Sequence, residues 1–222
     1  MDKKKVHLDG VYITYDMKPT LYQTAMRVIG VIACVINTVM LFWLAISKVK
    51  AFCFLTHWTV FITLAQLLMS LKCSFADKVN LRDRAVSHIL FEVNSVCAAL
   101  VLSVYWGHIH AEKKVEYANN PPHLFHTYIV HLWPQIFFFL DFITTDVKLI
   151  GWHAPYLFTP FVVAYSAVLY AGTVYFDKPI YSFLTFKNWK SPAILTGLVI
   201  FFMIFYVLLT VALEYFAKEK LE

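Results

Sequence analysis

The sequence FCFLTHWTVFITLAQLLMSL, residues 52–71, is apolar for most of its length and contains no charged side chain. About 20 residues of helix are as long as the hydrocarbon core of a bilayer is thick, so this stretch predicts a membrane-spanning helix. Its polar residues recur at spacings of three and four, which places them on one helical face. They are Thr56, Thr59, Thr63 and Gln66. Such a stripe is typical of an interface between membrane helices.

The composition of the whole chain is that of an integral membrane protein. Of its 222 residues, 60% are hydrophobic and only 15% are charged, whereas an average soluble domain has about 25% charged residues. The net charge of +5 is carried without a basic stretch interleaved with aromatics, which argues against nucleic acid as a partner. The four cysteines have no paired spacing and are expected to be small buried side chains rather than disulfides or metal ligands; they are Cys34, Cys53, Cys73 and Cys97.

Six segments are apolar for long enough to cross a membrane, and each is expected to be a helix because lipid offers no partners to backbone polar groups. The segments are 25–47, 52–71, 86–109, 124–145, 155–176 and 192–217. The sequence therefore predicts an all-α, polytopic membrane protein of one domain. Residues 1–24 are expected to be an N-terminal segment without a signal peptide, 25–217 the membrane domain with a tight turn at 47–51, and 218–222 a tail.

The orientation follows from the distribution of basic residues. With six spans, both termini and the loops 72–85 and 146–154 lie on one side, which carries 12 of the 19 Lys and Arg residues, Arg27 among them. The positive-inside bias predicts that both termini are cytoplasmic. Thr56 and His131 then lie roughly 10–13 Å below the opposite rim, at the same depth on different helices.

The segment 124–145 carries an unusual number of polar residues for a membrane span. Thr127, His131 and Gln135 are four residues apart and share one face, while Pro134 removes a backbone hydrogen bond and is expected to kink the helix. Asp141 lies ten residues after His131, which places it about 15 Å away along the axis and about 80° around it. Asp141 is therefore expected to bond a polar group of another helix rather than His131.

Two kinds of chemistry are compatible with these side chains. A Thr hydroxyl is a weak nucleophile that needs a neighbouring base, and the pKa of a histidine suits that task. Alternatively, histidines at the rim could bind a metal ion, but His108 and His110 are two residues apart and face different directions, so no metal or cofactor is predicted. The ordinary interpretations are that Thr56 is a packing hydroxyl, that the rim histidines lie among interfacial aromatics, and that Glu92 is a buried acid held by a partner.

The motif FLT at 54–56, at the start of a span, resembles one in the androgen-induced and androgen-dependent TFPI-regulating membrane proteins. Those are multi-pass hydrolases of fatty acid esters of hydroxy fatty acids. In that family a histidine is followed ten residues later by an acid, with a proline between, as in His131, Pro134 and Asp141. PIYSFL at 179–184 resembles a Tyr-containing turn of the family.

The chain also departs from the family pattern. The family acid is usually Glu rather than Asp, and its proline lies further from the histidine. Tyr128 stands where a second family histidine is usual. A shift of the alignment by a few residues would make His126 the base instead of His131.

The resemblance implies a threonine-dependent ester hydrolase with Thr56 as nucleophile, His131 as base and Asp141, Gln135 or His126 in support. Gln135 and His57 are candidates to stabilise the oxyanion. The substrate would be a lipid ester that enters from the bilayer, with its chains among the phenylalanines at 137–139.

A second resemblance, to the rolling-stone membrane proteins, implies instead a non-catalytic role in adhesion, fusion or regulation. The endoplasmic reticulum and the plasma membrane are both expected locations. The acyl-chain preference and the oligomeric state stay open.

Overall fold

The computed structural model describes residues 5–8, 11–14, 19–45, 47–76, 80–145, 147 and 149–219, with side chains from residue 19 to residue 212. The chain divides into two compact units, and each is described by itself. The first consists of Met1–Lys48 and Leu55–Lys148, and the second of Val49–Phe54 and Leu149–Glu222.

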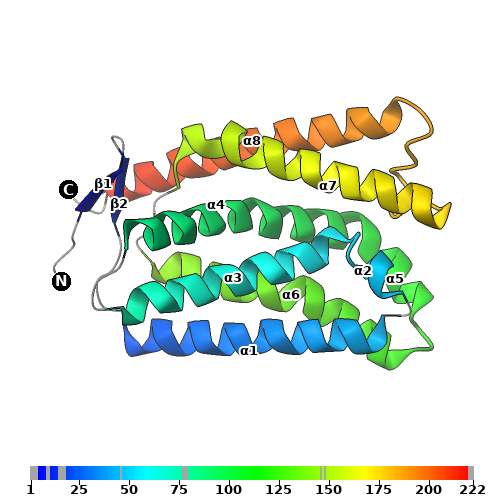
Figure 1. Cartoon of the computed structure of the whole chain (residues 1–222), viewed down its shortest axis with the longest axis horizontal. Helices are drawn as coiled ribbons and strands as arrows, with labels where there is room; N and C mark the ends of the chain where they lie inside the picture. Colours follow the sequence, from blue (N-terminus) through cyan, green and yellow to red (C-terminus); the bar gives the residue numbers. More distant parts are fainter. Residues whose placement is uncertain are drawn as a thin grey trace. The chain divides into compact units, whose positions relative to one another are not determined.

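The first unit is a bundle of four long helices: α1 (Leu21–Leu44), α3 (Leu55–Phe75), α4 (Leu81–Val104) and α6 (Pro121–Thr144). Helix α1 packs against α3 and α6, and α4 packs against the same two helices. Figure 1 shows these helices lying side by side. The arrangement buries the polar stripe of α3 in the interior of the bundle, because α3 has neighbours on several sides.

The second unit contains the helical turn α2 (Lys48–Ala51), the 3-10 turn η2 (Gly151–His153), and the helices α7 (Ala154–Phe176) and α8 (Lys190–Glu219). Helices α7 and α8 pack together along their length (Figure 1). The buried Tyr165 hydroxyl donates to the carbonyl of Cys53 at 3.0 Å and lies 3.2 Å from the hydroxyl of Tyr181. The turn that contains Tyr181 is thereby tied to α7 and to the segment that precedes α3.

The helices begin where the sequence supplies caps. The hydroxyl of Thr20 accepts the backbone N–H of Gln23, and the Gln23 side chain accepts the N–H of Thr20, which completes a capping box before α1. Asn80 caps α4 and Asn120 caps α6, where two prolines occupy the first positions. These caps satisfy backbone donors that a helix cannot pair internally. They extend the predicted spans by a few residues at their starts.

Five helices among the described residues are long and apolar enough to cross a membrane. They are Leu21–Leu44, Leu55–Phe75, Leu81–Glu116, Gly151–Phe176 and Lys190–Ala212. The chain is thus a helical protein of membrane-spanning type. The predicted span at 124–145 is the helix α6, which is 24 residues long and continues through Pro134, but it is not among these five.

The predicted span 86–109 differs from the structure. Helix α4 passes at Tyr105 into a π-helical turn, η1 (Tyr105–Ile109), and then into α5 (His110–Glu116). The backbone N–H of His110 donates to the carbonyl of Tyr105, five residues earlier. A π turn is rare, and it rotates the side chains that follow it relative to a regular α-helix.

The N-terminal segment contains structure that the sequence analysis did not predict. Strands β1 (Lys5–Leu8) and β2 (Val11–Thr14) pair antiparallel, with Lys5 opposite Thr14 and Leu8 opposite Val11. The predicted tail at 218–222 lies largely outside the described residues. The predicted turn at 47–51 is the short helix α2.

Helix α1 approaches α3 and α6 closely at Gly30. A Cβ atom placed on Gly30 would lie 2.7 Å from Cδ1 of Leu67 and 3.1 Å from Cβ of Phe137. A side chain here would displace the end of Leu67 and crowd Phe137. Close approach through small residues is a common basis of helix packing in membranes. Gly197 in α8 has nothing within 4 Å of the same position.

We expect Gly30→Ala to lower the free energy of unfolding by about 1–3 kcal/mol, because the added methyl group displaces the Leu67 side chain and crowds Phe137. Gly197→Ala is the matched control and is expected to be neutral or to stabilise α8 by up to about 1 kcal/mol. Thermal unfolding in detergent measures both. Equal melting temperatures for the two variants would contradict the close packing at Gly30.

Candidate functional site

Thr56 and His131, which the sequence analysis selected, are hydrogen-bonded to each other. Thr56 is the second residue of α3, and its Oγ1 lies 2.9 Å from Nε2 of His131 on α6. The other ring nitrogen, Nδ1, lies 2.6 Å from the carbonyl oxygen of Thr127. A carbonyl only accepts, so Nδ1 carries the proton of the neutral imidazole. Nε2 is then the acceptor, and the Thr56 hydroxyl donates to it.

The two helices that carry this pair run parallel and in register. Gln66 follows Thr56 by ten residues and Asp141 follows His131 by ten, and Nε2 of Gln66 donates to Oδ2 of Asp141 at 2.6 Å. Both hydrogen bonds therefore join residues that are 75 positions apart in the chain. The equal spacing explains why Thr56 and His131 lie at the same level, as the counting from the rim predicted.

The other polar residues of the α3 stripe make packing interactions. Thr59 donates back to the carbonyl of Leu55 at 3.1 Å, and Thr63 donates to Oδ1 of Asn94 on α4 at 3.0 Å. These are the roles that the ordinary interpretation assigns to hydroxyls in membrane helices. Within the stripe, Thr56 differs because its hydroxyl meets a base.

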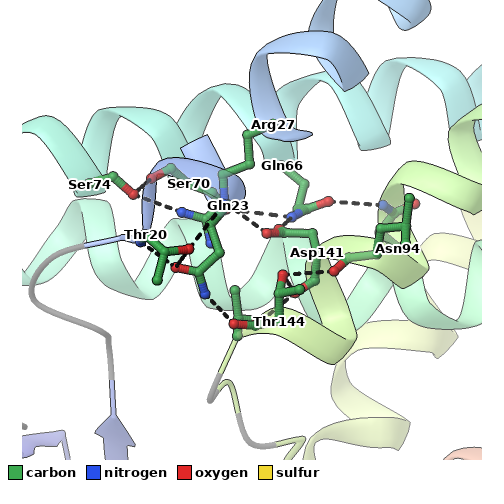
Figure 2. A network of polar contacts seen from close by, with 11 residues as sticks. Thr20, Gln23, Arg27, Gln66, Ser70, Ser74, Asn94, Asp141 and Thr144 are labelled. Atoms are coloured by element: carbon green, nitrogen blue, oxygen red, sulfur yellow. Dashed lines mark hydrogen bonds and ion pairs between the residues drawn. The ribbon is translucent and has the colours of Figure 1, made fainter. Parts of the chain in front are cut away.

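Asp141 lies at the centre of a buried polar network, which Figure 2 shows. The Arg27 guanidinium contacts Oδ1 of Asp141 through Nε at 2.7 Å, and Gln66 binds Oδ2. Arg27 also donates to Ser74, and Asn94 donates to Gln66 at 3.3 Å. Nearby, Gln23 donates to the Thr144 carbonyl. The network joins α1, α3, α4 and α6.

This network confirms the prediction that Asp141 bonds polar groups of other helices instead of His131. It corrects the assignment of Arg27, which was counted among the basic residues outside the membrane. Arg27 is only 7% exposed and its charge is paired with Asp141. It therefore contributes little to the charge bias of the loops.

An aromatic wall covers the other side of His131. The ring of Tyr105 stacks on the imidazole with 3.5 Å between centroids and 13° between planes. His110 lies 5.7 Å from Tyr105 and 5.5 Å from Tyr128, which in turn stacks on Trp106. Residues five apart diverge on an α-helix, so the π turn is what brings Tyr105 and His110 together. The sequence analysis did not identify Tyr105 as part of the site.

The remaining predicted residues lie near the pair in different roles. Gln135 is buried, and neither atom of its amide has a partner among the described residues. His126 and His57 are half-buried and close enough to His131 to interact electrostatically with it. The hydrogen bond from Thr56 goes to His131, not to the rival base His126.

Two further expectations concern other histidines and acids. Nδ1 of His123 lies 2.9 Å from Oδ1 of Asn120, the cap of α6, and Nε2 lies 3.2 Å from the carbonyl of Leu44 at the end of α1. Glu92 is buried beside Nε2 of His88 at 3.3 Å, one helical turn earlier. The prediction that Glu92 is held by a partner is confirmed.

The phenylalanines at 137–139 do not form a common wall. Phe138 is buried and packs on Phe91 with 5.3 Å between ring centroids, and Phe137 packs beside Gly30. Phe139 is 41% exposed on the outside of α6. Phe138 therefore belongs to the bundle core, whereas Phe137 is half-buried. The expectation that acyl chains lie among these side chains stays a prediction.

Comparisons of the chain with protein-family models, with curated proteins and with solved structures gave no match.

We expect Asp141→Leu to destabilise the bundle by about 3–5 kcal/mol, because it leaves the Arg27 guanidinium buried without its acid. The double variant Arg27→Met/Asp141→Leu should recover most of this loss. Lys72→Met is the control, since Lys72 pairs with Asp83 at 2.8 Å but is 59% exposed; it is expected to cost about 1 kcal/mol or less. Unfolding in detergent measures all three. A double variant no more stable than Asp141→Leu would contradict the pairing.

Proposed function

We propose that this protein is an intramembrane hydrolase of lipid esters, with Thr56 as the nucleophile and His131 as the general base. The observation that carries the proposal is the hydrogen bond from Thr56 to an imidazole whose other nitrogen is held by a backbone carbonyl. A nucleophile, a base and an orienting acceptor in sequence are what covalent catalysis by a hydroxyl group requires.

The proposed reaction has two steps. Thr56 Oγ1 attacks the ester carbonyl carbon, His131 Nε2 takes the hydroxyl proton, and the carbonyl electron pair moves to oxygen. When the tetrahedral intermediate collapses, the C–O bond breaks and the leaving alkoxide takes the proton from His131. Water then attacks the acyl-threonine with His131 again as base, and the acid and free Thr56 are released.

His131 can act as the base without Asp141 beside it, because another group holds its imidazole in the reactive tautomer. In a serine triad, an acid holds the histidine in the reactive tautomer. Here the Thr127 carbonyl, one turn earlier on α6, performs that orientation at 2.6 Å. Asp141 instead supports the site indirectly, because its network keeps α3 and α6 in register.

We further propose that α6 is a sixth span and that both termini are cytoplasmic. The polar residues of α6 that lower its mean hydropathy include Gln135 and Asp141, which face the bundle interior. Its exposed large side chains are apolar and follow helical spacing, as expected of a lipid-facing stripe. These are Phe125, Leu132, Ile136, Phe139 and Ile143.

A lipid substrate that enters from the bilayer fits this arrangement. His131 is half-buried, and the next residue, Leu132, is 38% exposed on the lipid-facing stripe of α6. The resemblance to the androgen-induced family favours fatty acid esters of hydroxy fatty acids as the substrate class. The endoplasmic reticulum and the plasma membrane remain the predicted locations.

We expect Thr56→Ala and His131→Gln each to lower kcat/KM for a branched fatty acid ester by at least about 10³-fold, because each removes one member of the reacting pair. Thr59→Val is the matched control: its hydroxyl bonds only its own helix, so activity should stay within about twofold of wild type. Hydrolysis in detergent or liposomes measures all three.

Full activity in both Thr56→Ala and His131→Gln would contradict the proposal. A wild-type protein without ester hydrolysis would favour the non-catalytic role that the rolling-stone resemblance implies. Loss of activity on adding a chelator would favour a metal-dependent enzyme.

A further inference from the structure

Among the described residues, the buried side chains of Tyr105 and Gln135, beside the Thr56–His131 pair, have no hydrogen-bond partner. The hydroxyl of Tyr105 and both amide atoms of Gln135 lie out of solvent and make no hydrogen bond within the described part of the chain. Tyr105 is 2% exposed and Gln135 is 1% exposed. A buried polar group without a hydrogen-bond partner usually lowers the stability of the folded protein. Two such groups at one place therefore suggest a functional role.

Both groups are held close to the reacting pair by different elements. Tyr105 stacks on the His131 ring at 3.5 Å, and its hydroxyl extends only one bond beyond the ring. Gln135 lies one helical turn after His131 on α6, on the face that also carries Thr127. Tyr105 comes from the π turn η1, so two separate helices supply the two groups.

The proposed reaction creates a negative charge on the carbonyl oxygen of the ester, and neither Thr56 nor His131 stabilises that charge. When Thr56 attacks the ester, the carbonyl oxygen becomes an oxyanion, and hydrolases stabilise this charge with pre-positioned donors. A phenol O–H and a carboxamide N–H are both suitable donors. His57, the other candidate from the sequence, is half-buried.

We propose that the Tyr105 hydroxyl and the Gln135 carboxamide bind the carbonyl oxygen of the ester and stabilise the tetrahedral intermediate at Thr56. This inference rests on the proposed function. Among the described residues the two donors have no partner, and the substrate supplies one. The π turn also gains a role, because it brings His110 beside the Tyr105 ring, with 5.7 Å between the ring centroids.

The test compares Tyr105→Phe and Gln135→Met, which keep the shape of each side chain and remove the donor. Each is expected to lower kcat by about 10²–10³-fold with little change in KM. Tyr128→Phe is the control, since Tyr128 belongs to the same aromatic wall but stacks on Trp106. Its kcat should stay within about twofold of wild type.

A second readout separates this role from a structural one. A long-chain alkyl boronic acid becomes tetrahedral when the Thr56 oxygen adds to boron, whereas an ether analogue of the ester stays in the ground-state shape. The two variants should bind the boronic acid at least about tenfold more weakly and the ether as the wild type does. Their melting temperatures should be unchanged or higher, because an unpaired buried polar group has been removed.

These experiments separate a failure of the oxyanion proposal from a failure of the proposed hydrolase activity. If Thr56→Ala and His131→Gln abolish activity but Tyr105→Phe and Gln135→Met keep wild-type kcat and boronic acid affinity, this inference alone is wrong. If Tyr105→Phe and Gln135→Met both lower the activity and the melting temperature, the two side chains have a structural role and the proposed stabilisation of the oxyanion is wrong. If the wild type neither hydrolyses esters nor binds the boronic acid, both proposals fall.

Discussion

The first unit depends on the parallel, in-register packing of α3 against α6. Two hydrogen bonds with the same sequence offset, Thr56 to His131 and Gln66 to Asp141, hold the helices at two levels ten residues apart. In lipid, a buried polar group that loses its partner finds no water to replace it. The two pairs therefore support each other, since a shift of one helix by a residue would break both.

The surroundings of Asp141 and of His131 differ in how many of their buried polar groups have hydrogen-bond partners. Around Asp141, an arginine, two amides and serine hydroxyls form a connected network across four helices (Figure 2). Around His131, the imidazole is satisfied, but the Tyr105 hydroxyl and the Gln135 amide find no partner in the part of the chain that the structure describes. A fully paired network suits a structural support, whereas unpaired donors beside a nucleophile suit a site that is completed by its substrate.

Much of the fold could be predicted from hydrophobic run lengths, because a membrane helix must be about 20 residues long whatever its neighbours. The level of Thr56 and His131 followed from orientation and helical rise, and the role of Asp141 followed from helix geometry. Helix α6 shows the limit of mean hydropathy: Gln135 and Asp141 are buried, its exposed large side chains are apolar, and averaging over the helix hides this division. That α6 crosses the membrane stays a proposal.

Other features could not be predicted in this way. Arg27 lies near the end of its span, where a basic residue is ordinarily interfacial, and only the three-dimensional structure pairs it with Asp141. Tyr105 stacks on His131 at the point where α4 passes into the π turn, and a π turn leaves no periodic signal in the sequence. The N-terminal hairpin does have a local signal, since Asp-Gly, here Asp9 and Gly10 between the segments KVHL and VYIT, is typical of a two-residue turn.

The most direct test of the central claim is to locate the adduct of an irreversible acyl-transfer probe. The purified protein is treated with a long-chain alkyl fluorophosphonate, digested, and analysed by peptide mass spectrometry. If His131 activates Thr56, the phosphonyl group is found on Thr56 in the wild type and is lost in His131→Gln. An adduct on another residue, or equal modification of Thr56 in both proteins, would contradict the account.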